Sequence, residues 1–433
     1  MRPNSLVTDL PSPTPQGLEV TDLTIPTRVA TALNEPKTRR TIAFINWAHA
    51  LDHYVMLIFP TVVIGLEVVY GRGYSELIVL STASFVAFGV FSLPAGWLAD
   101  HWSRRNMMAL FYVGSGLSLL AAGFAPTLAW LSVALFGLGM FAAIYHPVGM
   151  AVLIEASQAR GRTLAFNGVC GNLGAALAAG ITAALASALG WRGAFLLPGV
   201  LCVVTGLVYL WVTPDDRHHR VGRTSTPPVQ LSPVLGATIF SLFVVVALAA
   251  GLTFNIVSVS LPKIVDERFG EGIPLVAVGG LATAVFMCGA LAQLAVGRLV
   301  EKIAPHILFA VIVCLALVGV VWSAHATGPA LLVALALTMA AIYGQVTVND
   351  MVIARYTADA WRGRVYAVRY FLIFVSSGIA VAGIAFLHSR GGFGLVLAVT
   401  ALLTAIFLVA TIAIAVLVSG VENTQRRRFQ PAE

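Results

Sequence analysis

Apolar stretches long enough to cross a lipid bilayer recur along almost the whole chain. A transmembrane helix needs about 20 predominantly apolar residues. Only 10% of the 433 residues are charged and 58% are hydrophobic, whereas soluble proteins carry about 25% charged residues. The mean hydropathy is +0.89. The sequence therefore predicts an all-α integral membrane protein with twelve transmembrane helices, over residues 42–66, 77–99, 107–125, 128–154, 163–189, 192–213, 235–262, 275–299, 306–325, 328–354, 365–388 and 393–418.

The polar segments divide these helices into two sets of six. The first residues are polar and contain PSPTP at 11–15, which is typical of a flexible tail and not of a signal peptide. A second polar, proline-rich segment follows the sixth helix. The expected organisation is a cytoplasmic tail (1–41), an N-terminal six-helix bundle (42–213), a cytoplasmic linker (214–234), a C-terminal six-helix bundle (235–418) and a basic cytoplasmic tail (419–433).

The distribution of Lys and Arg predicts the orientation. Cytoplasmic segments of membrane proteins are enriched in these residues. With the N-terminus inside, 20 of the 26 basic residues fall in cytoplasmic segments, five fall in outer segments, and Arg369 lies within a helix. We expect both termini in the cytoplasm and the protein in the cell inner membrane. The net charge of +7 then indicates contact with anionic lipid and not with nucleic acid.

The two halves also repeat at one offset. Three motifs recur after 201 or 202 residues, each at an equivalent helix position, which indicates a duplication with two pseudo-symmetric bundles. Transporters built in this way bind substrate near the membrane midplane, between the halves. The pairs are Pro60 and Pro262, Gly96-x-x-x-Asp100 and Gly297-x-x-x-Glu301, and Arg160-Gly161-Arg162 and Arg362-Gly363-Arg364.

The segment GWLADHWSRR at 96–105 resembles the signature between helices 2 and 3 of the major facilitator superfamily. His101 and Ser103 replace a basic residue and a glycine of that signature. The resemblance implies the major facilitator fold and a cytoplasmic gate, in which the glycine allows close helix approach and the aspartate caps helix 11. The arginines would pair with acids such as Glu155. The gate residues expected are Gly96, Asp100, Arg104, Arg105, Glu155 and Glu301.

Two further stretches resemble the fosmidomycin-resistance type of drug exporter within that superfamily. They are YHPVGMAVL at 145–153 and GNLGAALAAG at 171–180. The resemblance implies efflux. The chain departs from many drug–proton antiporters, because helix 4 has no Arg and helix 5 has no Gly-Pro pair.

Few ionisable residues lie within the predicted helices, and such residues must face protein or water because they are costly in lipid. His49, Asp52 and His53 are spaced i, i+3 and i+4 and so share one face of helix 1 near the midplane. A carboxylate flanked by imidazoles can take up and release a proton near neutral pH. A static polar network that ties helix 1 to its neighbours is the alternative.

Other candidates lie in both halves. His146 precedes Pro147, which bends helix 4, a helix expected to line the cavity. Asp350 and Arg369 can form an ion pair that is either permanent or broken as the cavity opens, and a released Arg369 would attract an anionic substrate. Asn46, Asn172, Asn255 and Asn349 can bind substrate or hold helices together. The predicted substrate and proton site comprises His49, Asp52, His53, His146, Asn172, Asn349, Asp350 and Arg369.

The sequence predicts a transporter, not an enzyme, because it contains no catalytic motif. The four cysteines lie in apolar runs without metal-ligand spacing, and we expect no cofactor and no metal site. The leading hypothesis is proton-coupled efflux of a small organic molecule by a monomer, with protons and membrane lipid as the other partners. Proton-coupled uptake of a small anionic metabolite, and a non-transporting receptor of the same fold, remain open.

Overall fold

A computed structural model describes residues 36–156, 160–213, 233–270, 272–356 and 359–429. Every regular element in these ranges is helical. The elements are α2 (Pro36–Met56), α3 (Ile58–Tyr70), α4 (Tyr74–Ile78), η1 (Val79–Ser81), α5 (Thr82–His101), α6 (Arg104–Gly123), α7 (Leu128–Ala142), η2 (Tyr145–Gly149), α8 (Met150–Ala156), α9 (Arg160–Val212), α10 (Pro233–Arg268), α11 (Leu275–Leu299), α12 (Pro305–His325), α13 (Gly328–Tyr356) and α14 (Asp359–Phe429).

Ten helical stretches of the described chain are long and apolar enough to cross a membrane. Two of them, in α9 and α14, span 51 and 53 residues. At 1.5 Å per residue each would reach about 75–80 Å, more than twice the roughly 30 Å of a hydrocarbon core. Both contain a break with positive φ, at Gly190 (φ 74°) and Gly392 (φ 57°). Each long element is therefore two crossings, which confirms the twelve transmembrane helices.

The breaks add a pair to the repeat, because Gly190 and Gly392 are again 202 residues apart. The halves differ at the repeated proline. Pro60 lies in the first turn of α3 after an interruption at Leu57, whereas Pro262 lies inside the continuous α10. Proline cannot donate a backbone hydrogen bond and clashes with the preceding turn. Helix 1 is nevertheless divided where its counterpart, which carries the same proline, is continuous.

The helix ends extend beyond the predicted domain limits. The first helix begins at Pro36, inside the predicted tail of 1–41. The last helix continues to Phe429, inside the predicted tail of 419–433. The predicted linker lies almost entirely outside the described residues, and α10 begins at Pro233. The arginines of the second Arg-Gly-Arg motif lie on the first turns of α14.

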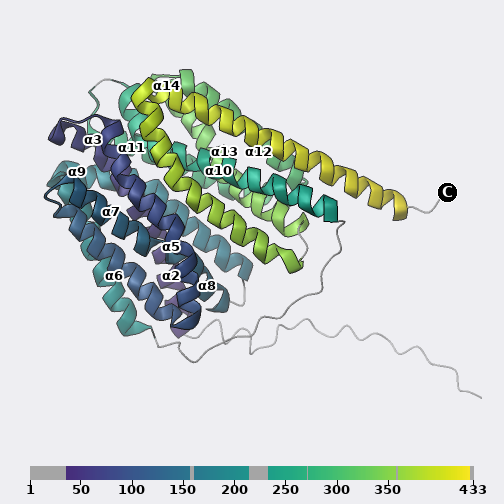
Figure 1. The fold of residues 1–433 in the computed structure, drawn as a ribbon, viewed down its shortest axis with the longest axis horizontal. Helices are drawn as coiled ribbons and strands as arrows, with labels where there is room; N and C mark the ends of the chain where they lie inside the picture. Colours follow the sequence, from purple (N-terminus) through teal and green to yellow (C-terminus); the bar gives the residue numbers. More distant parts are fainter. Residues whose placement is uncertain (1–35, 157–159, 214–232, 271, 357–358, 430–433) are drawn as a thin grey trace, which may run out of the picture.

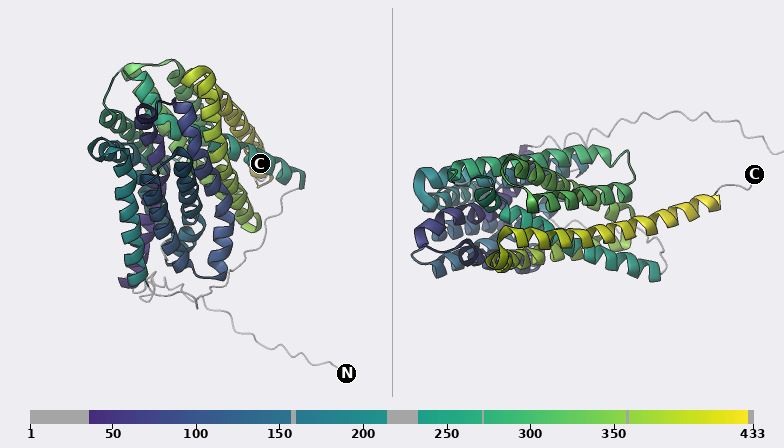
Figure 2. Two further views of the ribbon diagram at one scale, coloured as in Figure 1. Left: turned by 60° about the vertical axis from the view of Figure 1, so that its left-hand side comes forward. Right: turned by 90° about the horizontal axis from the view of Figure 1, so that it is seen from above.

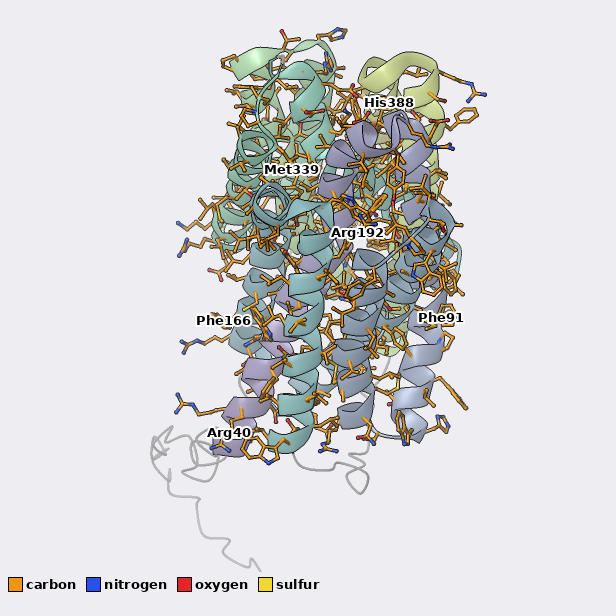
Figure 3. All side chains as sticks on the ribbon, turned by 90° about the vertical axis from the view of Figure 1, so that its left-hand side faces the viewer. Arg40, Phe91, Phe166, Arg192, Met339 and His388 are labelled. Atoms are coloured by element: carbon orange, nitrogen blue, oxygen red, sulfur yellow. The ribbon has the colours of Figure 1, made fainter. Side chains whose placement is uncertain are left out.

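The two sets of helices pack side by side, with the N-terminal set in purple to teal and the C-terminal set in green to yellow (Figures 1 and 2). The bundle has two ends. At the one we call the linker end, α5 meets α6 after His101; at the far end, α3 meets α4 through residues 71–73. Arg40 lies at the linker end and His388 at the far end (Figure 3).

Contacts between the halves run from the middle of the bundle to the far end. The Ser377 hydroxyl donates to the Phe85 carbonyl (3.2 Å), and the Gly180 amide donates to the Thr283 hydroxyl (3.0 Å). Ser75 and His388 are hydrogen-bonded at the far end (2.9 Å). In Figure 1 the two sets lie together at the upper left and diverge towards their other ends. The structure is thus closed at the far end.

Glycine allows helix 5 to pack tightly on helix 1. A Cβ at Gly174 would lie less than 3.0 Å from the backbone of Ala50, whereas a Cβ at Gly168, in the same helix, would meet nothing within 4 Å. Overpacking costs about 1–3 kcal/mol. We expect Gly174→Ala to lower the melting temperature of the purified protein and Gly168→Ala to leave it unchanged or slightly raised, because Ala favours helices over Gly. Equal melting temperatures for both variants would contradict this packing.

Candidate functional site

Four ionisable side chains meet inside the N-terminal half. The spacing of His49, Asp52 and His53 on α2 places them on one side of that helix, and His146 comes from η2. The His53 Nε2 atom lies 3.2 Å from His49 Nε2, and His146 Nε2 lies 3.4 Å from Asp52 Oδ2. The rings of His49 and His53 lie 5.5 and 5.7 Å from that of His146. We call these four residues the histidine cluster.

The shape of helix 4 places His146 in the cluster. Residues Tyr145–Gly149 form a π-helical turn between α7 and α8. Pro147 has no amide hydrogen to close an α-helical turn, which explains why the regular pattern fails here. Such π-turns often occur at functional sites. The sequence predicted a bend at Pro147 but not its form.

The Asp52 carboxylate is almost completely buried, with 2% of its side chain exposed. Its Oδ2 atom faces His146, and its Oδ1 atom has no hydrogen-bond partner among the described residues. The sequence placed Asp52 between His49 and His53, but its observed partner is His146. A buried carboxylate next to an imidazole is an arrangement that can exchange a proton.

Asparagine and tyrosine side chains orient the cluster. The backbone carbonyl of Asn167 accepts a hydrogen bond from His49 Nδ1 (2.8 Å). The side chain of Asn167 accepts from the Tyr145 hydroxyl (3.1 Å) and donates to Asn46 Oδ1 (3.0 Å). Because a carbonyl only accepts, a neutral His49 carries its hydrogen on Nδ1 and presents the Nε2 lone pair to His53. The sequence did not predict the contacts of Asn167 or of Tyr145. The only available signal was one more polar residue in an apolar run.

The histidine cluster touches the C-terminal half through aromatic rings. The His146 ring lies 5.2 Å from Phe374 of α14 and 6.0 Å from Phe88 of α5, and these two phenylalanines pack edge to face. His146 keeps 21% of its side chain exposed. The cluster therefore borders the interface between the halves.

A chain of amide side chains crosses this interface. The Asn172 amide donates to Gln293 Oε1 (2.6 Å), and the Gln293 amide donates to the Thr347 hydroxyl (3.2 Å). Asn172 belongs to α9 and its partners to α11 and α13. The sequence predicted a polar role for Asn172 but gave no sign of Gln293.

In the C-terminal half, Arg369 pairs with Asp350, as the sequence suggested. The guanidinium is buried, with 6% of the side chain exposed, whereas Asp350 is 40% exposed. A small cavity is lined by Arg369, Asn349 and apolar side chains of α10, among them Phe243. The predicted site residues therefore fall in three places: the histidine cluster, the Asn172 contact across the interface, and Asn349, Asp350 and Arg369 in the C-terminal half.

Comparison with known proteins decides the family. The family model of the Major Facilitator Superfamily matches residues 42–349, and this range is well over half of the chain. The chain belongs to the major facilitator superfamily. With its membrane-spanning helices, the chain is thus a multi-pass membrane protein of this superfamily.

Curated relatives within the superfamily match part of their length. A probable 4-methylmuconolactone transporter of Cupriavidus pinatubonensis is 27% identical over 58% of this chain and 60% of its own. A probable L-galactonate transporter of Escherichia coli is 26% identical over 34% and 33%. The membrane sensor protein UhpC of Salmonella typhimurium is 28% identical over 36% and 35%. The chain thus matches between a third and three fifths of these relatives' lengths.

The fold is shared with a solved bacterial homologue of the human lysosomal transporter Spinster, in an inward-facing and unoccupied conformation. The TM-score is 0.69 at 14% identity, over 89% of this chain and 95% of that one. This likeness supports the major facilitator fold predicted from the sequence.

At the linker end, the superfamily signature forms an ionic group within one half. Arg104 pairs with Asp100 (3.0 Å) and with Glu155 of α8 (2.8 Å). Arg105 instead donates to the Thr213 and Leu210 carbonyls at the end of α9. A Cβ at Gly96 would lie 3.3 Å from Pro147, so α5 and η2 are close here. The equivalent Gly297 faces open space and Glu301 is exposed.

We expect Asp100→Asn to favour the state in which the linker end is open. A charge–dipole contact made only in the closed state is worth about 1–2 kcal/mol, which is about a fivefold to thirtyfold population change. A Ser377→Cys reporter between the halves should then react more slowly with maleimide. Lys302→Gln, which removes an exposed charge at the same end, is the control. Equal rates in both variants would exclude a role of Asp100 in the cytoplasmic gate.

At the far end, ionic contacts join the two halves. Lys263 of α10 pairs with Glu67 of α3, and also with Asp266 (2.8 Å) and Glu267 (3.6 Å) of its own helix. His388 of α14 continues the group to Glu267 (3.1 Å). We call these five residues the far-end network. Lys263 is one of the five basic residues that the predicted topology places in outer segments, and the sequence did not predict its partners.

Proposed function

We propose that this chain couples proton movement to the transport of a small organic anion. The observation that carries the proposal is the buried contact between Asp52 and His146 at the border of the two halves. A group that exchanges a proton there faces the interface that opens and closes during transport. Proton occupancy can therefore bias the equilibrium between the two states.

The substrate class is inferred from charge and from the relatives. Arg369 is a buried cation beside a cavity, with an exposed acid as its partner. An anionic group that reaches Arg369 would compete with Asp350 for the guanidinium, which binds carboxylates and phosphates well. Relatives are described as probable transporters of L-galactonate, hexose phosphate and sulfoacetate. These names support a small oxygen-rich anion.

Uptake by symport is the direction we propose first, since an inward proton gradient can drive accumulation of an anion. Efflux is the second candidate, favoured by the resemblance of 145–153 and 171–180 to fosmidomycin-resistance exporters. A sensor that binds without transport is a third, because one relative is a membrane sensor protein.

Proteoliposomes with an internal pH dye separate these functions. A thermal-shift screen of sugar acids, sulfonates and sugar phosphates first identifies a ligand. Symport predicts acidification of the lumen when ligand is added outside. Antiport predicts alkalinisation of acid-loaded vesicles, and a sensor predicts ligand binding with no flux. Ligand flux without any proton movement would contradict proton coupling.

We also propose that the linker end faces the cytoplasm in the inner membrane, as the distribution of basic residues predicts. In a cysteine-free background, Ser225→Cys in the linker should react with an impermeant maleimide only after cells are permeabilised. Arg72→Cys, at the far end, should react in intact cells. The reverse pattern would overturn the orientation.

A further inference from the structure

The histidine cluster has the composition and spacing of a transition-metal site. One ligand atom each from His49, His53 and His146 can be chosen so that all three lie within 4.8 Å of one another. Two of the histidines are four residues apart on α2, an arrangement that presents two imidazoles to the same ion in zinc proteins. The sequence predicted no metal site, because no sequence pattern joins His146 to helix 1.

The orientation of His49 suits a ligand. Its Nδ1 atom donates to the Asn167 carbonyl (2.8 Å), which leaves the Nε2 lone pair directed at His53 Nε2, 3.2 Å away. Metal-binding histidines commonly donate their other ring N–H to a carbonyl or carboxylate. Zn–N bonds of about 2.0–2.1 Å in a tetrahedron separate two ligand nitrogens by roughly 3.4 Å. The two Nε2 atoms already lie close to that separation.

The charge and access of the cluster fit a cation. The buried carboxylate of Asp52 contacts His146 and can supply a negative charge to a bound cation. It can serve as a fourth ligand or accept the N–H of His146, and both roles are known in zinc sites. His53 and His146 are partly exposed and the latter borders the interface between the halves, so an ion can reach them.

We propose that His49, His53 and His146, supported by Asp52, form a binding site for a divalent transition-metal ion of the zinc class. Imidazole nitrogens suit Zn²⁺, whereas Mg²⁺ and Ca²⁺ prefer oxygen ligands. The bound ion links α2 to η2 next to Phe374. This inference does not rest on the proposed function, because binding is measured without substrate and without a proton gradient.

The test is a zinc titration of the purified full chain, carrying a tag without histidines, against a chelating indicator. The wild type and His325→Gln, which changes an exposed histidine outside the cluster, should bind one Zn²⁺ with equal affinity. His53→Gln and His146→Gln should each bind at least about tenfold more weakly. Equal affinity in all four proteins, or no binding by the wild type, overturns the proposal.

A second measurement avoids variants altogether. X-ray absorption of the wild-type zinc complex should show three imidazole ligands at about 2.0–2.1 Å. The Co²⁺ complex should show the intense visible absorption of a tetrahedral ion. A zinc spectrum with fewer than two imidazoles, or an octahedral Co²⁺ spectrum, overturns the proposal even if the variants fail to fold.

Discussion

Asp52→Asn should abolish accumulation of substrate against its gradient while leaving exchange across the membrane largely intact. The substitution keeps the size of the side chain but removes the carboxylate beside His146, which we propose as the group that takes up a proton. With one proton per substrate, a gradient of about one pH unit is worth about 1.4 kcal/mol and supports about tenfold accumulation. The variant should show no accumulation. Proteoliposomes with an imposed pH gradient, compared with substrate exchange without one, provide the measurement.

Asp350→Asn is the matched control, because it neutralises the other acid predicted within the helices. Asp350 pairs with the guanidinium of Arg369, which cannot give up a proton in exchange. Its loss should weaken substrate binding without uncoupling transport. If Asp350→Asn uncouples transport and Asp52→Asn does not, the proton pathway lies in α13 and the assignment is inverted.

Lys263→Met should shift the protein strongly towards the state in which the far end is open. The Lys263 side chain is 8% exposed and binds three acids, of which Glu67 belongs to the other half. Removing one partner of a buried ion pair typically costs about 3–5 kcal/mol. The acids here are partly exposed, so we expect the lower end of that range, and about 3 kcal/mol corresponds to roughly a hundredfold change in population.

Labelling of a Ser377→Cys reporter measures this shift. Ser377 is buried between the halves, where it donates to Phe85, and becomes reachable only when they separate. The reporter should react at least about tenfold faster with an impermeant maleimide in the Lys263→Met background. Lys302→Met, at the exposed linker end, should leave the rate unchanged. An unchanged rate in Lys263→Met would show that the far-end network does not hold the halves together.

The sequence was sufficient for the fold because its strongest signals are local. Each crossing is a run of apolar residues, and the repeat at 202 residues is visible without coordinates. The Asp350–Arg369 pair was also accessible, since both residues lie near the junction of consecutive helices. The first predicted helix began later than α2, and the last predicted helix ended earlier than α14. The reason is that polar residues continue a helix beyond the apolar run that defined the prediction.

The site was only partly accessible, because it depends on how distant helices are rotated against each other. Helical spacing put His49, Asp52 and His53 on one face, but no spacing rule connects helix 1 to His146, which is more than 90 residues away. Asn167 acts through its backbone carbonyl as well as its side chain, and a backbone contact leaves no mark on residue type. The contacts of Gln293 with Asn172 and of Glu67 with Lys263 also join distant helices of different halves, so helical spacing could not predict them.

The π-turn at Tyr145–Gly149 has a consequence for the whole of helix 4. A π-turn holds one residue more than the α-helical turn it replaces, and one residue corresponds to about 100° of rotation about the helix axis. His146 meets Asp52 within this turn, and Glu155 meets Arg104 beyond it. Deleting a single residue here would leave composition and hydropathy almost unchanged, yet the helix could then no longer point both side chains at their partners.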